Sequence, residues 1–210
     1  MDHNFKSQSV FDIHTHHYIN NPGVVISCSP ATFQGLKVKY PDSLFSVGVH
    51  PWDTSKSDSP EAIKRELELL ESIAGDKSVV AIGETGLDSL RGASLASQEA
   101  IFRRHIELSE QLSKPLVIHC VKAWDKLLSL HKEYSPRQNW AIHGFRGKPQ
   151  LARQLASRGI YLSLGKNYNS EVLNAVPQDL ILSETDEAES LPSLPFDTVP
   201  AIARFLNLSE

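Results

Sequence analysis

The sequence predicts an α/β protein, a trimmed TIM-type (β/α)8 barrel that forms a single domain over residues 1–210. Three observations predict this fold. Short apolar runs of strand length recur along the chain, helical patterns separate most of them, and side chains that suit metal ions stand at the ends of the runs. Because roughly 200 residues is the lower limit for such a barrel, a chain of 210 residues must have shortened some connections.

Apolar runs of four to six residues predict the strands. Continuous runs of this length fit strands that are buried on both faces, as in a parallel sheet. The predicted strands cover residues 10–14, 24–28, 44–49, 79–83, 116–119, 140–143, 160–164 and 180–183.

Helix signals lie between most of these runs. Ser59-Pro60 predicts a helix start, with a capping serine and proline at the first helical position. An apolar stripe follows it at Ile63, Leu67, Leu70 and Ala74. Comparable stripes predict helices around residues 101–112, 124–128, 151–155 and 199–206.

The connection between the first two strands is too short for a helix. It has only about ten residues and contains Asn21-Pro22-Gly23, whereas parallel strands normally need a crossover of about a dozen residues or more. We therefore expect a barrel that lacks the helix after its first strand.

Composition narrows the class of function. The formal net charge of −4 gives no general attraction for nucleic acid, so local cations and metals would have to hold such a substrate. No apolar stretch is long enough to cross a membrane, and the first residues lack the apolar core of a signal peptide. Cys28 and Cys120 lie in apolar runs, which is typical of buried thiols in a reducing compartment. We expect a cytoplasmic protein with no obligate protein partner.

Histidines and carboxylates stand at or directly after the predicted strands. In a barrel these strand ends converge on the face that carries the active site. His14 and His16 are two residues apart in an extended segment, so their side chains leave the same face. The full set is His14, His16, Glu84, His119, His143 and Asp186. It exceeds what one tetrahedral zinc needs and suffices for two ions that share a bridging carboxylate.

Six motifs in the same order give the chain a family resemblance. It resembles the TatD family of metal-dependent deoxyribonucleases, within the amidohydrolase-like metallohydrolases. The motifs are Asp12-Ile13-His14-Thr15-His16, Gly48-Val49-His50-Pro51, Gly83-Glu84-Thr85-Gly86-Leu87-Asp88, Lys114-Pro115-Leu116-Val117-Ile118-His119, His143-Gly144-Phe145-Arg146-Gly147 and Glu184-Thr185-Asp186. The third of these is the most specific.

The resemblance implies roles for the polar residues. His14, His16 and Asp186 would hold one metal ion, His119 and His143 the second, and Glu84 would bridge them. It also implies that the chain hydrolyses phosphodiester bonds in DNA.

The chain also departs from the family pattern. Members are typically longer, with a helix after the first strand. Lys122 stands where an arginine is usual after the fifth strand, and Glu187-Ala188-Glu189 replaces a small residue and proline.

A mechanism follows as a hypothesis. Two divalent ions would lower the pKa of a water, which would attack phosphorus. Asp186 would accept the proton from that water, and Glu84 would fix the spacing of the ions. His50 would be a substrate or indirect contact, or simply a packed histidine. Lys122, Arg146 and Lys166 each follow a strand and would meet phosphate at the mouth of the barrel, or would be ordinary solvated charges.

Alternatives stay open at this point. The same site could hydrolyse a small amide, lactone or phosphoester, or the barrel could bind metal without catalysis. The ions could be zinc, manganese, magnesium or nickel. His105 and His131 lie beside apolar helix stripes and are interpreted as structural, and Trp52 as a packing residue.

Overall fold

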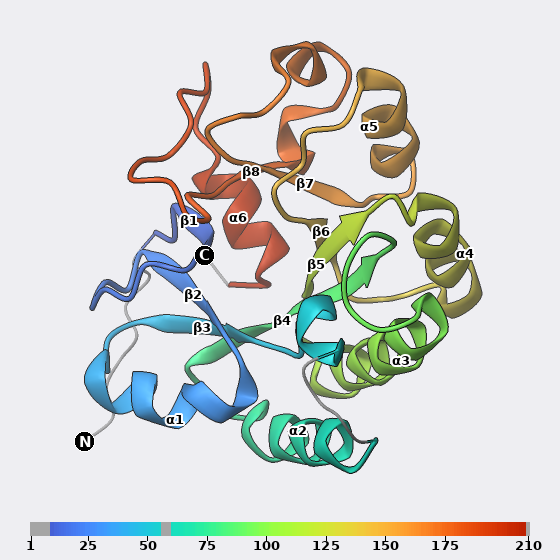
Figure 1. The fold of residues 1–210 in the computed structure, drawn as a ribbon. Helices are drawn as coiled ribbons and strands as arrows, with labels where there is room; N and C mark the ends of the chain where they lie inside the picture. The colour runs from blue at the N-terminus through green and yellow to red at the C-terminus, as the bar shows by residue number, and fades with distance from the viewer. Residues whose placement is uncertain (1–8, 56–59, 209–210) are drawn as a thin grey trace.

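A computed structural model describes residues 9–55 and 60–208. Its eight strands are all parallel and pair in chain order, so the predicted barrel is confirmed (Figure 1). The strands are β1 (Asp12–Thr15), β2 (Val24–Cys28), β3 (Leu44–Val47), β4 (Val79–Asp88), β5 (Leu116–Val121), β6 (Trp140–Ile142), β7 (Tyr161–Leu164) and β8 (Ile181–Ser183).

The barrel closes between its first and last strands through a short contact. Thr15 and Asp186 form an isolated parallel bridge just beyond β8. In this bridge the Asp186 N–H donates to the His14 carbonyl at 2.9 Å, and the His16 N–H donates to the Asp186 carbonyl at 3.0 Å. The closing contact therefore involves residues of the predicted site.

Helices cover the outside of most strands (Figure 1). The α-helices are α1 (Pro30–Lys39), α2 (Pro60–Ile73), α3 (Leu95–Leu112), α4 (Trp124–Tyr134), α5 (Pro149–Ala156) and α6 (Val199–Phe205), of which α1 to α5 lie outside the barrel. The short 3-10 helices are η1 (Pro51–Ser55), η2 (Ser170–Asn174) and η3 (Gln178–Leu180). No helix lies between β1 and β2, as predicted. Between β7 and β8, η2 and η3 replace an α-helix.

Two apolar layers follow from the two-residue period of the strands. The larger cluster packs alternate strand residues against the surrounding helices, with Phe33 of α1 and Phe102 of α3 among its buried side chains. The smaller cluster contains the intervening strand residues, which point to the opposite face of the sheet. Examples are Val117 and Ala141, and Phe205 of α6 packs with them. Since these strand positions point into the barrel, α6 packs against the barrel interior.

Some sequence predictions need correction. The helix α1 was not predicted, although Ser29-Pro30 carries the same start signal as Ser59-Pro60. The fourth strand runs to Asp88 rather than 83, so Glu84 lies inside β4 and not after it. Its hydrogen bonds to β5 continue past Glu84, which explains the longer strand. The strands predicted at 10–14, 44–49 and 140–143 are each displaced or shorter by a few residues.

Two further expectations concern the ends of elements and the membrane. The helix α2 begins at Pro60, as predicted, and Ser59 lies outside the described residues. Within the described part of the chain, no helix has the length and apolar character of a membrane span.

Cys28 and Cys120 are buried free thiols, and burial raises the pKa of each to about 12. Neither thiol is therefore poised to react.

Candidate metal centre

The strand period carries polar side chains into one end of the barrel. Val117 and Ala141 belong to the interior cluster, and two residues further along each chain segment stand His119 and His143. Successive residues of a strand alternate faces, so these two histidines continue the inward-facing positions. The interior is thus apolar at one end and rich in imidazoles at the end where the strands finish.

Glu84 lies at the centre of the site. Its side chain is buried with only 5% exposure, and its two carboxylate oxygens face different partners. The Oε2 atom lies 3.3 Å from His14 Nε2 and 3.5 Å from His16 Nε2. The Oε1 atom lies 2.7 Å from His143 Nε2 and 3.0 Å from His119 Nδ1. One carboxylate therefore separates two groups of imidazoles.

Asp186 joins the first of these groups. Its Oδ1 atom lies 3.9 Å from His14 Nε2 and 3.7 Å from His16 Nε2. Its backbone φ of 55° is in the left-handed region, where aspartate is among the more tolerant residues. The side chain is about one-quarter exposed, unlike that of His14, so its carboxylate reaches the mouth of the site.

The atom spacing and the unpaired atoms fit a metal centre. Two ligand atoms that each lie about 2.1 Å from a tetrahedral ion are roughly 3.4 Å apart, close to the spacing found here. His14 is fully buried, yet neither ring nitrogen has a hydrogen-bond partner among the described residues. Such unpaired burial is costly. A cation beside His14 Nε2 would remove the cost at that nitrogen.

The charges of Glu84 and His143 shift each other's pKa. Burial by itself raises the pKa of Glu84, but the facing charge of His143 and the hydrogen bonds from His119, His14 and His143 together outweigh it and hold that pKa well below its usual value. Burial likewise lowers the pKa of His143, whereas the charges and hydrogen bonds of Glu84 and Glu184 raise it well above the ordinary value. The site thus favours an ionised carboxylate and a positive charge beside it.

His50 also reaches Glu84, but with a different atom arrangement. Its Nδ1 accepts the backbone N–H of Trp52 at 3.1 Å. A neutral imidazole carries one N–H, so Nε2 bears the hydrogen and donates to Glu84 Oε1 at 2.8 Å. His50, Glu84 and His119 are close enough to share an ion. The Trp52 hydrogen bond instead makes His50 a donor.

The three basic side chains that were predicted to meet phosphate lie on the same end of the barrel as the site, but outside it. Lys122, Arg146 and Lys166 are exposed residues that follow β5, β6 and β7. None of their side chains has a hydrogen bond or ion pair within the part of the chain that the structure describes. The structure brings them to the mouth side of the strands but not into contact with the six central residues.

Sequence reasoning missed several residues beside the site. Asp88 binds His119 and the indole of Trp52, and the Arg91 guanidinium lies 4.4 Å from the Trp52 ring centroid. Glu184 is fully buried and accepts the Gly144 N–H at 2.6 Å. Asp88 stands four residues after Glu84 in the same strand, and this even spacing was the available signal.

The two histidines interpreted as structural have packing roles. His105 is fully buried, donates from Nδ1 to the Ile101 carbonyl and accepts the Val49 N–H at Nε2. His131 packs edge-on against Trp140. Neither contacts the central carboxylate. Trp52, interpreted as packing, does lie against the site, with its ring centroid 4.9 Å from that of His50.

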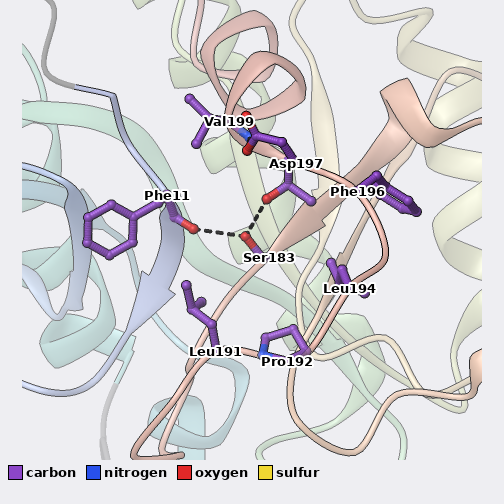
Figure 2. Close-up of a pocket in the computed structure, with 9 residues that line it drawn as sticks. Phe11, Ser183, Leu191, Pro192, Leu194, Phe196, Asp197 and Val199 are labelled. Carbon is purple, nitrogen blue, oxygen red and sulfur yellow. Dashed lines mark hydrogen bonds between the residues drawn. The ribbon is translucent and has the colours of Figure 1, made fainter.

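A separate small cavity lies beside β8 (Figure 2). It has a volume of about 180 Å³ and is lined by Phe11, Ser183 and residues between 191 and 199. Ser183 Oγ donates to the Phe11 carbonyl at 2.8 Å and bonds the Thr198 hydroxyl at 2.6 Å. None of the six central residues lines this cavity. It is therefore not part of the candidate metal centre.

Comparison with protein families gives one match that covers most of the chain. Residues 11–200 match the family described as TatD related DNase. A protein of Cronobacter sakazakii named 3'-5' ssDNA/RNA exonuclease TatD is 34% identical over 164 residues, which span 73% of this chain and 60% of that protein. An uncharacterised metal-dependent hydrolase of Buchnera aphidicola is 33% identical over 185 residues, which span 79% of this chain and 68% of that protein.

Solved structures support the same fold. A TatD homologue from Escherichia coli, YjjV, superposes with a TM-score of 0.70 at 20% identity, covering 95% of this chain and 90% of its own. A TatD family hydrolase from Entamoeba histolytica gives 0.66 at 21% identity, with 87% and 74% covered. At these identities the likeness concerns the fold. The chain spans less than two-thirds of the length of the Cronobacter protein, so shared activity does not follow from the match alone.

Proposed function

Because the chain belongs to the TatD related DNase family, we propose that it hydrolyses phosphodiester bonds of nucleic acid with two divalent metal ions. The observation that carries this proposal is the central position of Glu84. Its two oxygens face separate groups of imidazoles, as a bridging carboxylate requires. The donor set of nitrogen and oxygen atoms accepts zinc, manganese, magnesium or nickel to differing degrees.

Each ion would have its own ligands. His14, His16 and Asp186 would hold the first ion, as the distances around His14 Nε2 support. His119 and His143 would hold the second, and their facing nitrogens lie 3.4 Å apart. Glu84 would contribute one oxygen to each ion.

The chain's own residues would then carry the proton and orient the substrate. Bound divalent ions lower the pKa of a water and offset negative charge on the phosphate. Asp186 would accept the proton of the attacking water, because its carboxylate is partly exposed and Oδ1 already faces the histidines. The His50 Nε2–H, oriented by the Trp52 backbone, would donate toward a phosphate oxygen.

Surface cations would hold the remaining backbone of the substrate. Lys122, Arg146 and Lys166 follow three neighbouring strands on the mouth side and have no competing ion pair among the described residues. They would supply local attraction that the net charge of −4 does not. We propose single-stranded DNA as the substrate, with the Cronobacter relative's name adding RNA as a second substrate to test. We expect the reaction to take place in the cytoplasm.

The test combines metal analysis with a digestion assay. Purified protein should contain close to two ions per chain and degrade labelled single-stranded DNA. A chelator should abolish degradation, and added metal should restore it. A chromogenic lactone, an amide and a phosphomonoester assayed in parallel distinguish the small-substrate alternative. Metal binding without turnover of any ester or amide would contradict catalysis altogether.

A further inference from the structure

Asp88 is a buried carboxylate at the end of β4 that makes four hydrogen bonds. Its Oδ1 atom accepts the backbone N–H groups of Leu90 at 2.8 Å and Arg91 at 3.2 Å. Its Oδ2 atom accepts the indole N–H of Trp52 at 2.6 Å and faces His119 Nε2 at 3.1 Å. The residue is only 3% exposed, so its side chain is largely shielded from water. The carboxylate is thus held rigidly from one side by the loop and from the other by the indole.

This arrangement determines which nitrogen of His119 is free. An ionised carboxylate only accepts hydrogen bonds, so the His119 nitrogen that faces Asp88 must carry the hydrogen. A neutral ring has one N–H, and Nδ1 therefore presents a lone pair. That lone pair points at Glu84 Oε1, 3.0 Å away, and lies 3.4 Å from His143 Nε2. Acceptor atoms at such distances repel unless a cation or proton lies between them.

His50 also faces Glu84 Oε1, but with an N–H rather than a lone pair. Its Nδ1 accepts the Trp52 backbone N–H, which leaves Nε2 as the donor toward Glu84. Trp52 therefore takes part in orienting both rings. Its backbone N–H donates to His50 Nδ1, and its indole N–H donates to the Asp88 carboxylate that faces His119. His50 and His119 both reach Glu84 Oε1, but His119 presents a lone pair that can bind a metal, whereas His50 presents an N–H that donates a hydrogen bond.

We propose that Asp88 is a positioning residue that holds His119 with Nδ1 directed at the metal centre and so builds the half of the centre that His119 and His143 provide. The inference deepens the proposed function and rests on its metal centre. Outer carboxylates of this kind fix the tautomer and raise the basicity of a histidine ligand. Their loss weakens metal affinity by about 10–100-fold.

The variant that tests the proposal is Asp88→Asn. The asparagine amide can present an N–H to His119 Nε2, which then accepts and leaves the hydrogen on Nδ1, where no metal can bind. Long-range proton–nitrogen NMR of the metal-free full chain at about pH 9, above the usual histidine range, reports the tautomer directly. Wild-type protein should show His119 protonated at Nε2, and Asp88→Asn should show a rise of the Nδ1-protonated form.

Metal titration gives the second readout. Zinc or manganese binding, followed by calorimetry, should show one of the two sites weakened by about 10–100-fold in Asp88→Asn and the other changed by less than about threefold. Asp42→Asn is the matched control, since Asp42 is exposed and bonds Asn20 on another loop. Trp52→Phe removes one hydrogen bond of Asp88 but keeps the carboxylate, and should retain the wild-type tautomer.

The outcomes separate this inference from the proposed function. A wild-type spectrum with His119 protonated at Nδ1 overturns the inference, even if the Asp88 variant fails to fold. Unchanged affinity at both sites in a folded Asp88→Asn protein also overturns it. If both readouts follow expectation while the wild-type protein cleaves no nucleic acid, the role of Asp88 stands and the proposed function fails.

Discussion

The backbone of Asp186 pairs directly with that of His14, whose carbonyl accepts the Asp186 N–H at 2.9 Å. His14 lies in β1 and Asp186 follows β8, so the contact that closes the barrel also assembles one side of the candidate metal centre. Closure and site formation are therefore a single structural event. A change that loosens the join between β1 and β8 should affect stability and metal binding together.

Thr185→Val should test that coupling. The Thr185 hydroxyl bonds Asp12 Oδ2 at 2.7 Å and Thr15 Oγ1 at 2.8 Å across the closure. Its removal leaves a buried carboxylate underpaired, so we expect a loss of about 1–3 kcal/mol in the free energy of unfolding, measured with urea. Metal affinity should fall as well. Thr32→Val, at an exposed helix start, should change stability by a few tenths of a kcal/mol at most, roughly as other surface sites do.

Glu84→Gln should disrupt both halves of the centre. The amide keeps the shape of the side chain but loses the negative charge that faces five imidazoles and that two cations would share. We expect bound metal, measured by elemental analysis, to fall to one ion per chain or fewer. Glu171→Gln, on an exposed residue after β7, should retain the wild-type content. Two tightly bound ions in the Glu84 variant contradict the bridging role.

Asp186→Asn should slow turnover more than it weakens substrate binding. If Asp186 accepts the proton of the attacking water, its amide cannot do so, and kcat should fall by about 100-fold or more at saturating metal. The KM for single-stranded DNA should change little. Asp179→Asn, which affects only an exposed pair with Arg204, serves as the control. Full metal-dependent activity in Asp186→Asn refutes the assignment.

His105 should make stability depend on pH. Burial lowers its pKa to about 4, against 6.5 for an ordinary histidine. The unfolded chain therefore binds a proton between these values that the folded protein does not, so stability falls as pH decreases from about 6.5 to about 4. This shift accounts for about 3 kcal/mol. His105→Gln should be less stable at neutral pH but lose less on acidification, as measured by urea unfolding of both proteins across this range.

Cations at the mouth should act on substrate binding. Replacing Arg146 and Lys166 with glutamine should raise the KM for single-stranded DNA several-fold and reduce its salt dependence, with kcat nearly unchanged. Lys77→Gln, an exposed change in the loop that enters β4, tests whether charge anywhere on the surface suffices. An equal effect from Lys77→Gln means that the mouth cations have no special role.

Much of the fold and site could be predicted from local patterns. Apolar runs gave the eight strands, and the ten-residue gap excluded a helix after the first strand. The sequence predicts His14, His16, Glu84, His119, His143 and Asp186 at strand ends, and in the structure each lies in contact with at least one other of the six. These side chains meet because a parallel barrel gathers all its strand ends on one face.

Other features depended on contacts between distant segments. The extension of β4 past Glu84 follows from its pairing with β5, and the orientation of Glu84 follows from imidazoles on other strands. In the sequence, Asp88 is only the last residue of a motif. Its contacts with His119 and Trp52 are visible only in the structure.

By itself, the sequence determined the barrel, its missing helix and the set of side chains that face its open end. The tertiary structure alone decided which ring nitrogen of each histidine points inward, and which of His50 and His119 can serve as a ligand. The reason is physical. Strand periodicity fixes the face from which a side chain leaves, whereas a ring nitrogen's role depends on hydrogen-bond partners that only folding brings near.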